Sequence, residues 1–149
     1  MLFGKAKRIV KRILIVEDEP LTAFDNEVTI ASFGYEVVAT LDTFASATAL
    51  LDREPIDLIL SDVNLSGERS GIDLARAAKE RGVPVLFSTG NQLPAEAASI
   101  AVGCLSKPYS ERQLRDALDS VDRLLSGETV TPTRGLELYN PQPPQDPER

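Results

Sequence analysis

Five short apolar runs constrain what this chain can fold into. They cover residues 13–16, 36–39, 56–60, 83–87 and 101–105. Most of them are nearly continuous and rich in leucine or β-branched residues, which is typical of strands covered on both faces. Between the runs, apolar residues recur at helical spacing. Strands that alternate with helices predict βαβ units, and therefore an α/β fold with a five-stranded parallel sheet and about five helices.

Three of the intervening segments, and the segment that follows the fifth run, have clear helical stripes. The stripes are Leu21, Phe24, Val28 and Ala31; Phe44, Ala47, Leu50 and Leu51; Ile72, Ala75 and Ala78; and Leu114, Leu118, Val121 and Leu125. We expect each stripe to cover one face of the sheet, and Gly34 to end the first of these helices. The segment 93–100 is the weakest candidate, because it is short, begins near Pro94 and is rich in alanine. We expect it to be poorly formed.

The two ends of the chain differ in composition from its middle. Residues 1–11 form a basic N-terminal arm, and 127–149 contain five of the ten prolines. We therefore expect one folded domain over 12–126, followed by a proline-rich tail over 127–149 that is extended or disordered. The tail is too short for a DNA-binding or enzymatic output domain, so we expect output through contact with a downstream protein.

Charge and cysteine content exclude several function classes. The formal net charge of −7 disfavours a nucleic-acid partner, because an acidic surface repels phosphates. The single cysteine, Cys104, cannot form an intrachain disulfide, and no apolar run approaches the roughly 20 residues of a membrane span. We therefore expect a cytoplasmic protein without a membrane span, in which Cys104 is a small core residue.

Polar residues follow four of the predicted strands. Glu17 and Asp18 follow the first run, Asp62 the third, Thr89 the fourth and Lys107 the fifth. In a doubly wound sheet, ligands bind outside the carboxyl ends of the strands. We therefore expect these side chains to converge on one edge of the sheet, although they are far apart in the sequence.

These groups are suited to binding a phosphoryl group. Glu17, Asp18 and Asp62 would raise one another's pKa, and a cation resolves that conflict. Mg²⁺ prefers oxygen ligands and combines carboxylates with phosphate oxygens, while Lys107 supplies a second positive charge and Thr89 a hydroxyl. An aspartate carboxylate can itself act as the nucleophile and form an aspartyl phosphate, and Asp62, on the central strand, is the best candidate.

Each group also has a purely structural interpretation. Residues 17–19, which precede Pro20, could cap the next helix. Asp62 could form a turn before Asn64, and Lys107 could be a surface charge. Complementary groups at four separate strand ends favour the functional interpretation, because chance seldom combines them.

Over residues 11–126 the chain resembles the receiver domain of response regulators. The matching stretches are residues 13–20, 58–65, 71–74, 87–90 and 107–109. They resemble the family's first strand with its acidic pair, its phosphoacceptor strand and the glycine-containing segment that follows, its fourth-strand hydroxyl motif and its Lys-Pro pair. The resemblance implies a flavodoxin-like (CheY-like) doubly wound sheet in the strand order 2-1-3-4-5.

The resemblance also implies a role for each site residue. Asp62 would be phosphorylated, and Glu17 and Asp18 would hold Mg²⁺ together with Asp62 and the backbone carbonyl of Asn64. The phosphodonor would be a histidine kinase or a phosphotransfer protein. The chain has no histidine, so the phosphoryl group must come from another molecule.

Two further residues complete the implied site. Thr89 and Lys107 would bind the phosphoryl oxygens. The implied protein is a single-domain response regulator, a signalling switch with slow self-dephosphorylation rather than a metabolic enzyme. Tyr109, Leu105 and the exposed side of the last helix would contact the downstream protein.

One position departs from the family pattern. Most receivers carry Phe or Tyr three residues before the lysine, and this chain has Cys104 there. Together with Phe87-Ser88-Thr89-Gly90, this resembles the subgroup with a Phe-Ala-Thr-Gly-type motif, found in bacterial signalling through atypical histidine kinases.

Three alternatives remain. An aspartate-nucleophile phosphatase would need a second carboxylate where this chain has Asn64. A pseudo-receiver would bind partners without phosphorylation. A flavin or nucleotide module on the same fold would need a glycine-rich first loop, and residues 17–19 would repel its phosphate.

Overall fold

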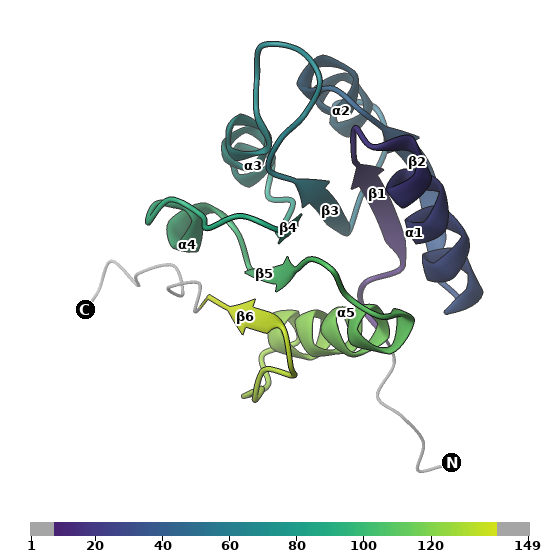
Figure 1. Ribbon diagram of the computed structural model, residues 1–149, viewed down its shortest axis with the longest axis vertical. Helices are drawn as coiled ribbons and strands as arrows, with labels where there is room; N and C mark the ends of the chain where they lie inside the picture. Colours follow the sequence, from purple (N-terminus) through teal and green to yellow (C-terminus); the bar gives the residue numbers. More distant parts are fainter. Residues whose placement is uncertain (1–7, 140–149) are drawn as a thin grey trace.

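Five parallel strands and one antiparallel strand form a single sheet in this computed structural model, which describes residues 8–139 (Figure 1). The strands are β1 (Arg12–Val16), β2 (Glu36–Leu41), β3 (Leu58–Asp62), β4 (Val85–Thr89), β5 (Gly103–Ser106) and β6 (Leu136–Leu138). Their spatial order is β2-β1-β3-β4-β5-β6. The predicted α/β fold and the order 2-1-3-4-5 are therefore confirmed, with one strand more than the five expected.

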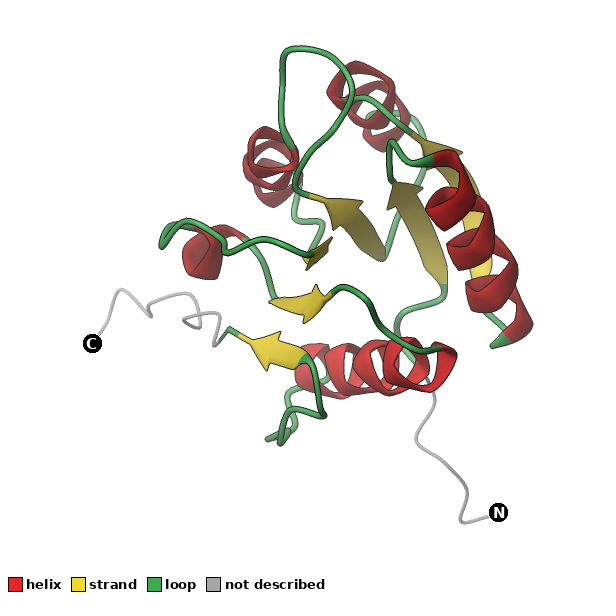
Figure 2. Cartoon of the chain, in the orientation of Figure 1, coloured by secondary structure: helices red, strands yellow, loops and turns green. Residues whose placement is uncertain are grey.

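Helices cover both faces of this sheet (Figure 2). They are α1 (Pro20–Ser32), α2 (Phe44–Leu51), α3 (Gly71–Glu80), α4 (Ala97–Ile100) and α5 (Glu111–Leu125). Residues of α1 and α5 pack into one core cluster, while residues of α2, α3 and α4 pack into the other. The sheet is thus the middle of three layers.

Most of the predicted helical stripes face the sheet. Ile72, Ala75 and Ala78 of α3 are buried, as are the first three residues of the α5 stripe. Gly34 follows the end of α1 with a positive φ of 97°, a conformation that a residue without a Cβ adopts readily. The segment 93–100 contains only the four-residue α4, as its composition indicated.

The stripe predicted for α1 is the exception, since it faces solvent. Leu21, Phe24 and Val28 are 75%, 62% and 52% exposed. The residues that α1 buries are Ala23, Asn26 and Ile30. The apolar periodicity predicted the helix but the wrong buried face. The inner face contains a polar residue, Asn26, which the pattern assigned to the solvent side.

The sixth strand lies within the segment that was expected to be an extended or disordered tail. β6 pairs with β5 in antiparallel register, with Leu136 opposite Leu105 and Leu138 opposite Gly103. Leu136 is only 6% exposed. A Cβ at Gly103 would lie 2.4 Å from the Glu137 carbonyl oxygen, so β6 can approach only because this residue is glycine. Residues 140–149 of the predicted tail lie outside the described residues.

Part of the basic N-terminal arm packs on the domain. The backbone N–H groups of Ile9 and Val10 donate to Asp122 Oδ1 at 2.9 and 2.8 Å. Val10 belongs to the core cluster between the sheet, α1 and α5. The described end of the arm is therefore anchored to α5, while residues 1–7 lie outside the described residues.

Gly103→Ala tests the close approach of β6. The new methyl group would overlap a backbone oxygen that cannot rotate away, so we expect the free energy of unfolding to fall by about 1–3 kcal/mol. Urea denaturation followed by circular dichroism measures it. Gly90→Ala is the matched control, because its Cβ would meet nothing closer than 4.0 Å, and we expect a change of about 0.5 kcal/mol or less. Equal losses in both variants would contradict the steric explanation.

Candidate functional site

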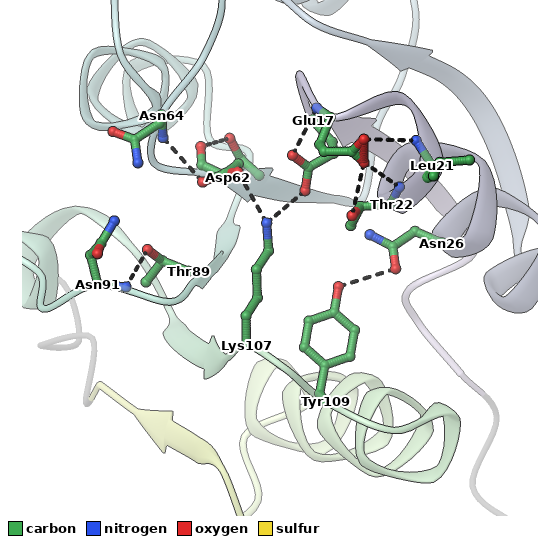
Figure 3. A network of polar contacts seen from close by, with 12 residues as sticks. Glu17, Leu21, Thr22, Asn26, Asp62, Asn64, Thr89, Asn91, Lys107 and Tyr109 are labelled. Carbon is green, nitrogen blue, oxygen red and sulfur yellow. Dashed lines mark hydrogen bonds and ion pairs between the residues drawn. The ribbon is translucent and has the colours of Figure 1, made fainter.

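The parallel register brings the predicted site residues to one edge of the sheet. Asp62, at the end of β3, lies opposite Ser88 of β4, and Thr89 lies opposite Ser106 of β5. Glu17 directly follows β1, and its N–H donates to the Leu41 carbonyl at 2.9 Å. Figure 3 shows Glu17, Asp62, Thr89 and Lys107 around one small region.

Lys107 lies between two buried carboxylates. Its Nζ donates to Glu17 Oε1 at 2.8 Å and to Asp62 Oδ2 at 3.0 Å (Figure 3). The Glu17 and Asp62 side chains are 2% and 11% exposed, so neither carboxylate is well solvated. A cation between them offsets the cost of burying like charges, and the three residues hold one another in place.

The two carboxylates differ in proton affinity. Burial raises the pKa of Glu17, and its hydrogen bond from Lys107 offsets only part of that effect. Burial also acts to raise the pKa of Asp62, but the N–H of Asn64, the neighbouring Glu17 and Lys107 together hold that pKa below its usual value. Asp62 therefore stays ionised at neutral pH, the form that a nucleophilic carboxylate requires.

Asp62 is oriented from both ends of its carboxylate. The backbone N–H of Asn64 donates to Oδ1 at 3.1 Å, while Lys107 binds Oδ2. The carbonyl of Asp62 accepts a hydrogen bond from the Ser61 hydroxyl at 2.8 Å. The side chain is thus fixed at the carboxyl end of the central strand.

Three carboxylates at this edge fit a divalent cation. One oxygen each from Glu17, Asp18 and Asp62 lies within 4.8 Å of the others. Oxygen ligands on opposite sides of Mg²⁺ are about 4.2 Å apart at bonds of about 2.1 Å, so separations of this size are compatible with a shared ion. Asp18 is exposed, and it brings the cluster into contact with solvent.

The acidic segment serves two purposes. Glu19 caps α1, with its side chain accepting from the N–H groups of Leu21 and Thr22 at 3.4 and 3.1 Å. Its neighbours Glu17 and Asp18 belong to the carboxylate cluster. The helix-capping interpretation therefore holds for Glu19, whereas Glu17 and Asp18 have the geometry of metal ligands.

Thr89 lies on the neighbouring strand and is 4% exposed. Its Oγ1 accepts from the N–H of Asn91 at 3.1 Å, and its carbonyl accepts from the N–H of Lys107 at 2.9 Å. The second bond ties the end of β4 to the backbone that carries the site lysine.

Gly71 lies in a stretch matched to the receiver family, but its steric role beside Asp62 was not predicted from the sequence. A Cβ there would lie 2.1 Å from the Asp62 carbonyl oxygen, and its N–H donates to the Val63 carbonyl at 2.7 Å. Only glycine lets α3 begin directly against the backbone of Asp62. The available signal was a glycine placed shortly after an acidic strand end.

The position that departs from the family pattern is buried. Burial raises the pKa of the Cys104 thiol to about 11, as expected for a small core residue rather than a reactive thiol. Glu137 of β6 lies opposite Cys104, and Tyr139 packs against the same core cluster. Leu105 is fully buried, so its predicted contact with a downstream protein is wrong, while Tyr109 is half-buried.

Among residues 8–139, no helix is long and apolar enough to cross a membrane.

Comparison with known proteins gives consistent matches. A sequence model described as "Response regulator receiver domain" matches residues 13–119. The transcriptional regulatory protein PdtaR of Mycobacterium tuberculosis is 31% identical, covering 87% of this chain and 68% of PdtaR. The phyllosphere-induced regulator PhyR of Methylorubrum extorquens is 35% identical over 56% of this chain, and the match spans only about a third (32%) of PhyR.

Among solved structures, SdrG from Sphingomonas melonis Fr1 is similar to this chain. The TM-score is 0.63 at 32% identity, and the match covers 74% of this chain and 94% of that structure.

Lys107→Met tests the ion pairs at the centre of the site. It leaves two buried carboxylates facing each other, so we expect the free energy of unfolding at pH 7 in metal-free buffer to fall by about 1–3 kcal/mol. Adding Asp62→Asn should recover part of the loss, because one charge is then gone. Urea denaturation measures both, with Lys11→Met, at an exposed lysine, as control. If Lys107→Met behaves like Lys11→Met, the bridge contributes nothing to stability.

Proposed function

Because the chain belongs to the response regulator receiver domain family, we propose that it accepts a phosphoryl group on Asp62 and works as a single-domain response regulator. The observation that carries the proposal is the pairing of Lys107 with Asp62 and Glu17, beside a third carboxylate within metal-binding range. The proposed phosphodonor is a histidine kinase or a phosphotransfer protein, and the proposed output is contact with a downstream protein.

In the proposed reaction, a free oxygen lone pair of Asp62 attacks the phosphorus of a phosphohistidine. The new O–P bond forms as the N–P bond breaks, and the imidazole leaves with its electron pair and takes up a proton from solvent. The N–H of Asn64 orients the carboxylate before attack. Lys107 lies close enough to Asp62 to stabilise the negative charge on the phosphoryl oxygens during transfer. The hydroxyl of Thr89 lies at the same edge of the sheet.

Mg²⁺ is the proposed cofactor. Glu17, Asp18 and Asp62 would hold it with the backbone carbonyl of Asn64, and it would neutralise charge on the transferring group. The aspartyl phosphate would then be hydrolysed slowly by water. We propose no turnover of external substrates, because Asn64 occupies the place where an aspartate-nucleophile phosphatase needs an acid.

The exposed face of α1 is the proposed docking surface for the phosphodonor. Its apolar stripe consists of Leu21, Phe24 and Val28, and α1 begins directly after the acidic segment of the site. Contiguous exposed apolar residues mark protein-binding surfaces more often than scattered ones do. A donor bound there would reach the edge of the sheet where Asp62 lies.

Intact-protein mass spectrometry tests the acceptor. Incubated with acetyl phosphate and Mg²⁺, the wild type should gain one phosphoryl group, and Asp62→Asn should gain none. Asp25→Asn, the same chemical change at an exposed site on α1, should behave like the wild type. An unmodified wild type would favour a phosphorylation-independent pseudo-receiver. Steady hydrolysis of phosphate esters would favour the phosphatase.

Phe24→Gln tests the docking surface. We expect phosphotransfer from a histidine kinase to Asp62 to slow by about tenfold, since burying an aromatic side chain contributes about 1.5–3 kcal/mol. Phosphorylation by acetyl phosphate should stay unchanged, because this small donor needs no docking. Arg53→Gln, at an exposed residue near the start of β3, serves as control for both donors. Equal slowing with both donors would point to damage at Asp62 and not to lost docking.

A further inference from the structure

Asn26 is a polar residue buried on the inner face of α1, with 5% of its surface exposed. The hydroxyl of Tyr109 donates to its Oδ1 at 3.1 Å (Figure 3). A buried amide without a partner would cost about 1–3 kcal/mol. The bond gives the buried Asn26 Oδ1 a donor and fixes where the Tyr109 hydroxyl lies.

This bond joins the two segments that carry the charges of the site. Tyr109 lies two residues after Lys107, in the loop between β5 and α5. Asn26 lies in α1, which begins directly after Glu17, Asp18 and Glu19. The Tyr109 ring also packs against the core cluster between the sheet, α1 and α5. The side chain of Tyr109 therefore holds the lysine loop against the helix that follows the acidic segment.

We propose that Tyr109 and Asn26 are positioning residues that set where Lys107 lies relative to Asp62. Their role in phosphorylation rests on the proposed function, whereas their hold on Lys107 does not. Lysine has a flexible four-carbon stem, so its ammonium reaches two carboxylates at once only if the backbone at its base is fixed. On β4, the Thr89 carbonyl fixes that backbone by accepting from the Lys107 N–H at 2.9 Å. The Tyr109–Asn26 bond fixes it from the α1 side.

The metal ligands are held differently. Glu17 is bonded to the Glu19 N–H at 3.2 Å, and Asp62 is oriented by Asn64, so neither depends on Tyr109 alone. Removing the Tyr109–Asn26 hydrogen bond should therefore increase the mobility of Lys107 and leave Glu17, Asp18 and Asp62 in place. Phosphorylation rate and Mg²⁺ affinity should then change independently.

The kinetic test uses Tyr109→Phe, Asn26→Leu and the double variant. Each single variant removes the same hydrogen bond, so we expect phosphorylation by acetyl phosphate to slow by about three- to tenfold in each, with half-saturating Mg²⁺ unchanged within about twofold. The double variant should be as slow as the singles, because the bond is lost only once.

Measuring stability in the same variants distinguishes a positioning role of the Tyr109–Asn26 bond from a general contribution to the stability of the fold. Tyr109→Phe leaves the buried Asn26 Oδ1 without its donor, and Asn26→Leu removes the acceptor of the Tyr109 hydroxyl, whereas the double variant removes both groups, so the denaturation midpoint should partly recover in the double variant. The phosphorylation rate should not recover with it. Rates that follow stability through all three variants would overturn the proposal.

An NMR measurement tests the positioning without any phosphorylation. The order parameter of the Lys107 ε-methylene, assigned by comparison with Lys107→Ala, should fall in Tyr109→Phe and Asn26→Leu. Tyr139→Phe is the matched control, because its hydroxyl bonds to the exposed Glu137 at 3.4 Å on β6, and Lys107 should keep its wild-type order there. A Lys107 order parameter unchanged in Tyr109→Phe would overturn the proposal.

Different results reject the proposed function and the positioning role of Tyr109 and Asn26. A wild type that gains no phosphate, combined with a Lys107 that loosens in Tyr109→Phe, rejects the proposed function and retains the positioning role.

Discussion

The ammonium of Lys107, held between Glu17 and Asp62, is the interaction on which the rest of the site depends. Neither carboxylate is well solvated, so without a cation their mutual repulsion and desolvation would oppose folding. The bridge joins residues that follow or end β1, β3 and β5, and it therefore requires the parallel register of those strands. In the proposed function, Mg²⁺ would bind beside the same carboxylates, and Lys107 would then pair with a phosphoryl group.

Backbone groups make this arrangement rigid. The N–H of Asn64 orients Asp62, the Thr89 carbonyl accepts from the Lys107 N–H, and Gly71 lets α3 begin against the backbone of Asp62. In the proposed reaction, groups held this way would need little reorganisation as charge moves onto the phosphoryl group, and this is electrostatic preorganisation. The hydrogen bond between Tyr109 and Asn26 joins the loop that carries Lys107 to α1.

The fold was predictable because its strands are continuous apolar runs, and parallel strands joined by helices allow few topologies. The convergence of Glu17, Asp62 and Lys107 was predictable for the same reason. The buried face of α1 was not predictable, because it contains Asn26, a polar residue that the pattern places on the solvent side. The sixth strand was missed as well, because three residues carry little periodicity and their docking depends on the missing Cβ of Gly103.

The resemblance to receiver domains implied the order of the parallel strands. The sequence by itself determined the α/β class and which charged groups meet at the carboxyl edge. These features follow from the type of each residue and its place relative to a strand end. Tertiary structure alone decided that Glu19 caps a helix while Glu17 pairs with Lys107, that Leu21 and Phe24 face solvent, and that β6 completes the sheet. Those outcomes depend on partners distant in sequence, because a polar group can be buried only where another group satisfies it.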